Sequence, residues 1–267
     1  MSDARSPSFA PADSTGAGCG GACATAFPLP FTMAFQPIVD VRENSVIAHE
    51  ALVRGPNGES AASILAAVTS ETLYAFDQAC RVQAITCAAR IGLPGRLNIN
   101  FLPKAIYEPR TCIQTTLTAA ARTGFPVERL TFEMVETEET TPGHLARIVK
   151  TYREIGFHIA LDDYGTGHSG LLRIAELRPD TIKVDRQLVT GVAEDSMLQA
   201  IARVILQLCH ETGIEAVFEG VETEAEARCL VNLGARYMQG FLFARPTLER
   251  AVTAPEISWP VLHATQG

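Results

Sequence analysis

Acidic side chains close several short apolar runs along this 267-residue chain. The runs are rich in the β-branched and aromatic residues that favour strands. A carboxylate at the end of a buried strand costs free energy unless a cation or a hydrogen-bond donor meets it. The acids at or near these endings, joined by one asparagine, are Glu50, Asn100, Glu133, Asp162, Asp163, Asp185 and Glu219. We therefore expect a cation or a set of donors where these side chains meet.

The chemistry of this set points to hard metal ions. Oxygen ligands without His or Cys favour Mg²⁺ or Mn²⁺. In the adjacent pair Asp162 and Asp163, one carboxylate can bridge two ions while its neighbour holds the second ion. Two metals at close range are the apparatus of phosphoester hydrolysis. A helix N-cap is the alternative for any single Asp, but Glu is a poor cap and several endings are Glu.

Lys183 lies two residues before Asp185 in the run TIKVD, so strand alternation aims both side chains to the same face. A lysine among carboxylates could orient a reacting water or help to deprotonate it. The alternative is a simple ion pair that fills the protein interior. After Asp163, the stretch YGTGHSG contains three glycines, which suit close packing against a ligand or movement. An ordinary strand-to-helix connection is the alternative for that loop.

The elements that would position these residues alternate between strands and helices from Phe31 onward. Such alternation implies a parallel sheet, and eight strand-like runs in about 240 residues predict a TIM-like (β/α)8 barrel. The carboxyl ends of barrel strands converge on one face, which would gather the acids. Only Val41 to Asn44 separate the first two runs, too few residues for a parallel crossover, so we expect an antiparallel first strand. A doubly wound open sheet is the alternative fold. The eight runs are FTMAFQPIV, SVIAHEALV, RLNINFLP, LTFEMVE, HIALDD, TIKVD, EAVFEGVE and YMQGFLFARP.

Helical periodicity predicts helices over Ile64–Ala89, Ala105–Arg122, His144–Ile155 and Met197–Glu211. Within the last of these, a stripe of aliphatic residues is predicted to face the core: Ile201, Val204, Ile205 and Leu208. Four cysteines on helical patterns should pack as small apolar groups: Cys80, Cys87, Cys209 and Cys229. His49 alternates to the opposite side of its strand from Glu50, which favours a structural role.

Composition divides the chain and excludes some functions. Residues 1–26 are rich in Gly, Ala, Ser and Pro and read as a flexible tail, which leaves residues 27–267 as the barrel domain. A net charge of −8 argues against binding to DNA, RNA or an anionic membrane. The chain has neither an apolar run of about 18 residues nor a recognisable secretory signal. Seven scattered cysteines indicate reduced thiols, so the expected location is the cytoplasm.

Two further motifs lie in the tail. Residues 16–21, GAGCGG, satisfy the dinucleotide pattern G-x-G-x-x-G, but neither a strand nor a helix flanks them, so we interpret the match as accidental. Cys19 and Cys23 form a C-x3-C pair that could bind a metal or act in redox chemistry. No second Cys or His pair lies nearby, and two incidental thiols are the alternative.

Seven sequence blocks carry a family resemblance. HEALVRG, NINFLP, FEMVE, DDYGTGHSGL, IKVD, EGVE and QGFLFARP occur in this order over residues 31–248. They closely resemble the EAL-domain family of cyclic di-GMP phosphodiesterases. The resemblance implies a metal-dependent enzyme that opens one phosphodiester of cyclic di-GMP to give linear 5′-pGpG. It also implies two Mg²⁺ or Mn²⁺ ions per site and a homodimer whose contact lies near the loop after Asp163.

The resemblance also implies a role for each matching residue. The expected metal ligands are Glu50, Asn100, Glu133 and Asp162 for one ion, with Asp162 and Asp163 for the other. Lys183 would contact the nucleophilic water, and the catalytic set is expected to be Glu50, Lys183 and Glu219. Arg54 would grip a substrate phosphate through its bidentate guanidinium, with Leu52 and Gln239 as further substrate contacts. Glu136 would anchor the glycine-rich loop.

The chain departs from the family pattern at two positions. His168 stands where Tyr is usual, and Leu102 stands where many members have Ser. Neither residue is an expected ligand, and no expected ligand is lost. Two other functions remain open at this point: a catalytically silent cyclic di-GMP receptor, and a Mg²⁺-dependent barrel enzyme acting on enolates. The second would use a lysine base beside fewer metal-binding acids.

Overall fold

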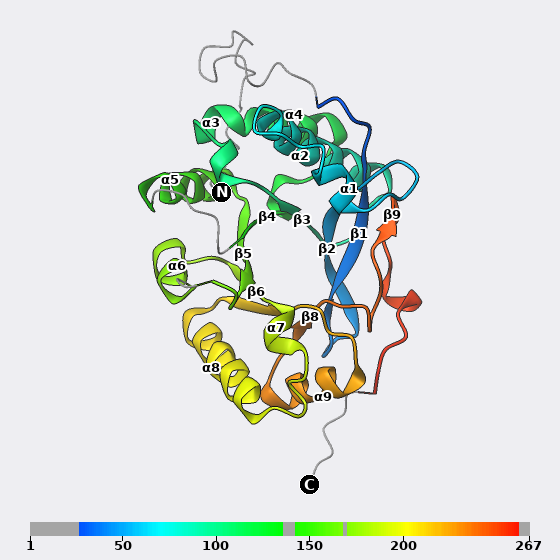
Figure 1. Cartoon of the computed structure of the whole chain (residues 1–267), viewed down its shortest axis with the longest axis vertical. Coiled ribbons are helices and arrows are strands. Elements are labelled where there is room, and N and C mark those ends of the chain that lie inside the picture. The colour runs from blue at the N-terminus through cyan, green and yellow to red at the C-terminus, as the bar shows by residue number, and fades with distance from the viewer. Residues whose placement is uncertain (1–26, 136–141, 168–169, 262–267) are drawn as a thin grey trace, which may run out of the picture.

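The computed structural model describes residues 27–135, 142–167 and 170–261. Its strands form one sheet in the order β2-β3-β4-β5-β6-β7-β8-β1-β9, and β1 also pairs with β2, so the sheet closes into a barrel (Figure 1). This closure confirms the predicted barrel and rules out the open doubly wound sheet. The predicted tail, the glycine pattern at 16–21, Cys19 and Cys23 lie outside the described residues.

The first strand runs against its neighbours, as its short connection predicts. β1 is antiparallel to β2, β8 and β9, whereas every other neighbouring pair from β2 to β8 is parallel. The strands are β1 (Thr32–Asp40), β2 (Ser45–Arg54), β3 (Arg96–Asn100), β4 (Leu130–Val135), β5 (His158–Tyr164), β6 (Thr181–Val184), β7 (Glu215–Phe218), β8 (Tyr237–Met238) and β9 (Thr247–Leu248).

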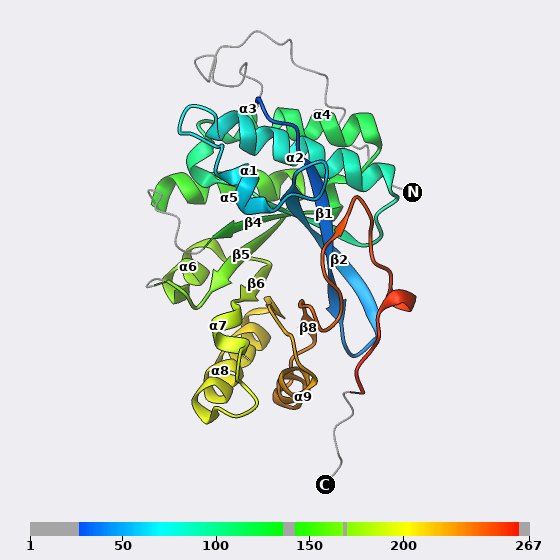
Figure 2. The same ribbon diagram turned by 45° about the vertical axis from the view of Figure 1, so that its right-hand side comes forward.

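Helices cover the outside of the barrel. Figure 2 shows α2 and α4 together at one end of the molecule and α8 and α9 together at the other. The helices are α1 (Ala61–Leu65), α2 (Leu73–Arg90), α3 (Pro109–Cys112), α4 (Gln114–Thr123), α5 (Pro142–Ile155), α6 (Gly170–Leu177), α7 (Arg186–Val189), α8 (Ser196–Thr212) and α9 (Glu224–Leu233). Within the described ranges, no helix combines the length and apolar character that crossing a bilayer requires.

Three predicted elements are shorter or divided. The helix expected over Ile64–Ala89 is split into α1 and α2, because the side chains of Thr69 and Thr72 bond to each other's backbone N–H groups and make a turn. The helix expected over Ala105–Arg122 is also divided, since Pro109 begins the short helix α3. The last predicted strand keeps only Tyr237–Met238. The chain then leaves the sheet at Gly240, whose backbone packs against Val221.

The side chains of the barrel strands alternate between two environments. The main apolar core lies between the sheet and the helices and includes Leu97, Ile99, Phe132 and Ile182. Inside the barrel, Ile38, Ala48 and Val217 form a small separate apolar cluster. Ala48 and Val217 each precede a candidate acid, Glu50 or Glu219, by two residues along the chain. The barrel interior therefore holds a small apolar cluster toward the strand starts, and the candidate acids lie toward the strand ends.

The predicted helix packing is right for most of its residues. Cys87 and Cys209 are buried, and Cys80 and Cys229 are partly buried against the core, as expected. Val204 is an exception: its side chain is 65% exposed, because α8 turns this position away from the sheet. His49 is fully buried and its Nε2 lies 2.9 Å from the Val252 carbonyl, while burial lowers its pKa. This geometry supports the structural role predicted for it.

Candidate active site

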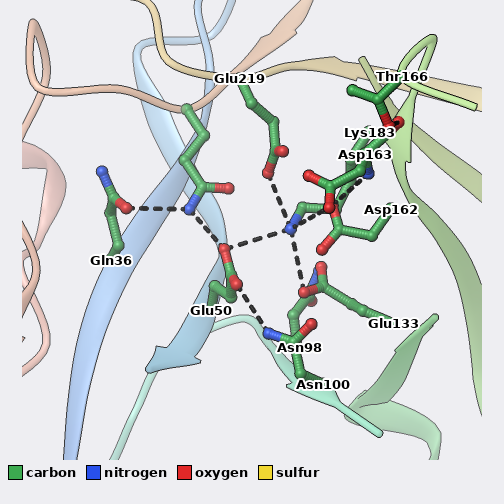
Figure 3. A network of polar contacts seen from close by, with 11 residues as sticks. Gln36, Glu50, Asn98, Asn100, Glu133, Asp162, Asp163, Thr166, Lys183 and Glu219 are labelled. Carbon is green, nitrogen blue, oxygen red and sulfur yellow. Dashed lines mark hydrogen bonds and ion pairs between the residues drawn. The ribbon is translucent and has the colours of Figure 1, made fainter. Parts of the chain in front are cut away.

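Four carboxylates from different parts of the barrel surround the ammonium group of Lys183. Its Nζ lies 2.8 Å from Glu219, 3.0 Å from Glu133, 3.2 Å from Glu50 and 3.2 Å from Asp162 (Figure 3). These acids belong to β2, β4 and β5 and to the residue directly after β7, and Lys183 itself lies on β6. The barrel therefore brings together the acids that the strand endings predicted.

This cluster differs from an ordinary interior ion pair. Lys183 is 1% exposed, and one ammonium faces four carboxylates instead of one. Buried carboxylates are costly when they lack compensating positive charge. The arrangement thus carries an excess of negative charge that a bound cation would compensate.

The ionisation of the cluster reflects this imbalance. Burial acts to lower the pKa of Lys183, but the surrounding carboxylates outweigh it and hold the pKa well above its usual value. Burial raises the pKa of Glu133 to about 8 and that of Glu219 well above its usual value, and it also raises the pKa of Asp162. Glu50 is buried too, but Lys183 and the amides of Gln239 and Asn100 leave its pKa lowered. Protons on carboxyls with a raised pKa would offset part of the excess negative charge of the cluster.

Asp162 and Asp163 reach one site through a backbone irregularity. Adjacent residues of a regular strand point to opposite faces. Here the pairing of β5 with β6 shifts register between Leu161 and Tyr164, and Asp163 adopts the left-handed conformation with φ of 53°. A positive φ is uncommon for a residue other than glycine, and such residues concentrate at functional sites. Burial and the charges of Asp162 and Asp185 raise the pKa of Asp163 to about 6.

The carboxylates form two overlapping groups that could hold metal ions. In one group, oxygens of Glu50, Glu133 and Asp162 lie within 4.8 Å of one another. Asp162, Asp163 and Glu219 form the other group by the same criterion, so Asp162 belongs to both. Two buried oxygens, Asn98 Oδ1 and Gln239 Oε1, also accept no hydrogen bond from the described residues. An oxygen-only donor set of this kind fits hard divalent cations.

Amide side chains hold the acids in place. Asn100 donates to Glu50 Oε1 at 2.9 Å, and Gln239 donates to Glu50 Oε2 at 2.8 Å. The sequence reasoning missed two further amides. Asn98 donates to Glu133 at 2.7 Å, and Gln36 accepts from Gln239 at 3.2 Å. Strand alternation could have indicated Asn98, because it precedes Asn100 by two residues. Gln36 becomes evident only from its pairing with Glu50 in the β1–β2 register.

A cleft of about 240 Å³ opens beside the cluster. Leu52 and Gln239 line it together with Glu50 and Glu219. The described lining residues do not include Arg54, whose guanidinium donates to the Val53 carbonyl at 2.7 Å. Sequence reasoning missed several further lining residues: Gln36, Arg186, Gly220, Glu222, Gly240 and Phe241.

Other residues predicted for the site are not part of the observed cluster. Asp185 borders the cleft, but its carboxylate caps α7 by accepting from the Gln187 N–H at 2.8 Å, which is the N-cap alternative for an Asp ending. Lys183 alone of this pair enters the ion cluster. Glu136 and His168 lie outside the described residues. Leu102 is partly buried just after β3.

Comparisons with known proteins agree with this geometry. The family model described as "EAL domain" matches residues 30–246. A standalone versatile EAL protein from Vibrio cholerae O395, solved with cyclic di-GMP bound, is 44% identical with a TM-score of 0.83, covering 86% of this chain and 98% of that one. BlrP1 from Klebsiella pneumoniae, solved with manganese and cyclic di-GMP, is 34% identical with a TM-score of 0.79, covering 84% of this chain and 58% of that one.

A curated relative bears on function in another way. The blue light- and temperature-regulated antirepressor BluF of Escherichia coli K12 is 28% identical over 240 residues. The match covers 89% of this chain and 59% of BluF, so this chain spans little more than half of that relative. The family model covers most of this chain, and the fold and acidic cluster agree with it. The chain therefore belongs to the EAL-domain family.

Proposed function

We propose that this chain is a divalent-cation-dependent phosphodiesterase that hydrolyses cyclic di-GMP to linear 5′-pGpG. The observation that carries the proposal is the ring of four carboxylates around Lys183, which together with Asp163 forms two potential metal groups that share Asp162. Membership of the EAL-domain family and similarity to EAL structures that hold cyclic di-GMP support the choice of substrate.

The proposed ligand roles follow the two groups. Glu50, Asn100, Glu133 and Asp162 would hold one cation, and Asp162 with Asp163 would hold the second, which Glu219 also approaches. When bound, two divalent cations of the Mg²⁺ or Mn²⁺ type would lower the pKa of a water and offset charge on the phosphate. We propose Mg²⁺ or Mn²⁺ as the bound ions. The structure of BlrP1 with manganese supports this choice of ion.

The remaining residues of the site would bind and orient. Lys183 keeps its proton in this cluster because its pKa is raised, so it is suited to donate a hydrogen bond to the attacking water. Attack on phosphorus would displace the 3′ oxygen and leave a 5′-phosphate. In the cleft, Leu52, Gln239 and the half-exposed ring of Phe241 would contact the nucleotide, because an aromatic face can stack on a base. Arg54 would have to turn from the Val53 carbonyl to reach a phosphate.

The proposal extends to assembly and location. The glycine-rich loop after Asp163 leads into α6, where Leu171 and Leu172 are exposed next to Met197 and Val204 of α8. Exposed apolar patches of this kind mark protein contacts, and we assign this patch to a homodimer. The five described cysteines form no disulfide, which supports a reducing location such as the cytoplasm.

A catalytically silent receptor is the second candidate function. Similarity to BluF favours it, because that relative matches most of this chain and is an antirepressor. The complete set of acids around Lys183 favours the enzyme. Enolate chemistry is less well supported, because one metal and a lysine base would leave several of these acids without a role.

A hydrolysis assay separates the candidates. Purified chain is incubated with cyclic di-GMP and Mg²⁺, Mn²⁺ or Ca²⁺, and the nucleotides are separated by chromatography. We expect pGpG with Mg²⁺ or Mn²⁺, and a loss of more than about 100-fold in Glu50→Gln. The matched control is Glu43→Gln, the same change at an exposed position of the same hairpin. Tight nucleotide binding without pGpG under every metal condition would support the receptor instead.

A further inference from the structure

A buried ion pair on α2 lies outside the carboxylate cluster. The Arg81 guanidinium contacts the Asp77 carboxylate at 2.5 Å, and the two side chains are 0% and 2% exposed. Burying two charges costs several kcal/mol per ion unless further hydrogen bonds satisfy them. Neither residue belongs to the predicted or observed set around Lys183, so the pair needs its own explanation.

Asp77 uses its second oxygen to hold the segment that follows β3. Its Oδ1 accepts from the Leu102 backbone N–H at 3.0 Å. β3 ends at Asn100, and the intervening Phe101 N–H donates to the Glu133 carbonyl at 3.0 Å. The main chain just beyond Asn100 is thus fixed from two sides, by β4 and by α2.

Arg81 ties the same segment to α5. Its second terminal nitrogen lies 3.3 Å from the hydroxyl of Tyr152, a fully buried residue of α5. The Tyr152 ring packs on Phe101 with ring centroids 5.6 Å apart. The guanidinium therefore fixes the direction of the Asp77 carboxylate and also supports the ring that packs against the end of β3.

This bracing ends at the carboxylate cluster. Asn100 lies two residues before Leu102, and its amide donates to Glu50 Oε1 at 2.9 Å. Glu50 in turn contacts Lys183 at 3.2 Å. A continuous series of contacts thus runs from Arg81 through Asp77, the Leu102 N–H and Asn100 to the proposed metal site.

We propose that Asp77, held in direction by Arg81, is a positioning residue that fixes the end of β3 so that Asn100 faces Glu50. The inference rests on the proposed function, because its consequence is a preformed cation site. Asp77 touches none of the reacting groups and acts through the Leu102 N–H. Partners that orient the ligands of a metal typically change its affinity by about 10–100-fold when they are removed.

Two double variants isolate the hydrogen bond from the buried charge. Asp77→Leu alone would leave the Arg81 charge buried without a partner, so both variants carry Arg81→Met. Asp77→Asn/Arg81→Met keeps an oxygen that can accept from Leu102, whereas Asp77→Leu/Arg81→Met does not. Asn and Leu have the same branched arrangement of side-chain heavy atoms, and the two proteins carry equal charge.

Calorimetric titration of the full chain with Mn²⁺ gives the readout, with circular dichroism as the check of folding. We expect Mn²⁺ binding about 10–100-fold weaker than wild type in the Leu/Met variant. The Asn/Met variant keeps the acceptor for Leu102 and lacks only the guanidinium, so it should bind Mn²⁺ at least about threefold more tightly than the Leu/Met variant. Amide exchange at Leu102 should be faster in the Leu/Met variant only. A purely structural role would lower the unfolding temperature while Mn²⁺ affinity stayed the same.

Equal Mn²⁺ affinity in wild type and the folded Leu/Met variant would overturn the positioning role alone. Wild-type chain that binds no Mn²⁺ would overturn the proposed function, and the positioning role with it. The two failures are therefore distinguishable in one set of titrations.

Discussion

At the scale of single residues, the site is a balance of charge around Lys183. One ammonium cannot compensate four carboxylates, so protons or cations must do so. Glu50 and Glu133 can be found from the sequence, because Glu133 closes an apolar run and Glu50 lies late in another. Gln36 and Asn98 are harder to find, since an amide on a strand is unremarkable until its partner is known. Asn100 could be found because it ends a predicted strand, whereas the place of Gln36 depends on strand register, which the residue types alone do not reveal.

Removing the central charge should destabilise the metal-free protein. Lys183→Met leaves the buried carboxylates without their ammonium partner, and breaking buried ion pairs costs about 3–5 kcal/mol. Mn²⁺ should then raise the unfolding temperature of the variant more than that of wild type. Thermal unfolding in EDTA and in Mn²⁺ measures both effects. Equal stability of the two proteins in EDTA would contradict the charge balance described above.

Metal affinity should rise with pH. Burial is the main cause that raises the pKa of Glu133 to about 8 and that of Asp163 to about 6. At acidic pH a cation must therefore displace protons from these carboxyls. A raised carboxyl pKa extends the protonated range upward, and affinity is therefore lowest below about pH 6. We expect the apparent Mn²⁺ affinity to increase at least about tenfold between about pH 6 and pH 8.5.

Calorimetry in buffers of different ionisation enthalpy measures both the affinity and the protons released. Glu133→Gln, which has no proton to displace, should flatten the pH dependence. Affinity that does not change with pH in wild type would show that these carboxyls are already ionised before the metal binds.

At the scale of elements, the barrel delivers acids from separate strands to one end. Alternating strands and helices were enough to predict the barrel, and the short link after β1 was enough to predict its antiparallel direction. The sequence predicts that Asp162 and Asp163 serve one site, but it does not predict the backbone irregularity that brings them together. A regular strand would separate them, and the register shift in β5 depends on its pairing with β6. Exposure of Val204 likewise depends on how α8 turns against the sheet.

The exit of the chain from β8 should depend on a glycine. Gly240 directly follows Gln239 of the site, and a Cβ at Gly240 would lie 2.0 Å from the Val221 carbonyl oxygen. Gly240→Ala should lower the free energy of unfolding by at least about 1–3 kcal/mol. Gly143→Ala in the first turn of α5 is the control, because nothing lies within 4 Å of the added Cβ. Urea unfolding that ranks the two variants equally would contradict the close approach.

At the scale of the whole molecule, the net charge of −8 does not indicate how the acids of the site are arranged. An acidic protein is a poor partner for polyanions, yet the acids that matter are gathered where cations would offset them. The proposed pairing of two copies is also a property of the whole chain. The face formed by α6 and α8 is the one on which the apolar side chains Leu171, Leu172, Met197 and Val204 remain uncovered.

Charge placed on that face should separate the proposed dimer. Leu172 is 75% exposed, and Leu172→Glu would put a carboxylate into the contact at the cost of its desolvation. We expect light scattering to give the mass of a dimer for wild type and of a monomer for the variant. Leu65→Glu on α1, another exposed leucine, should remain dimeric. A Leu172→Glu variant that stays dimeric would place the contact on another face.

The most direct test follows oxygen from solvent into the product. Hydrolysis of cyclic di-GMP by the full chain in ¹⁸O-labelled water with Mn²⁺ is analysed by mass spectrometry of the linear dinucleotide. The proposed attack of water on phosphorus predicts a single ¹⁸O atom in the 5′-phosphate of pGpG, and neither label nor product when EDTA removes the metal. Nucleotide that remains bound but intact, or pGpG formed without the label, would contradict the account.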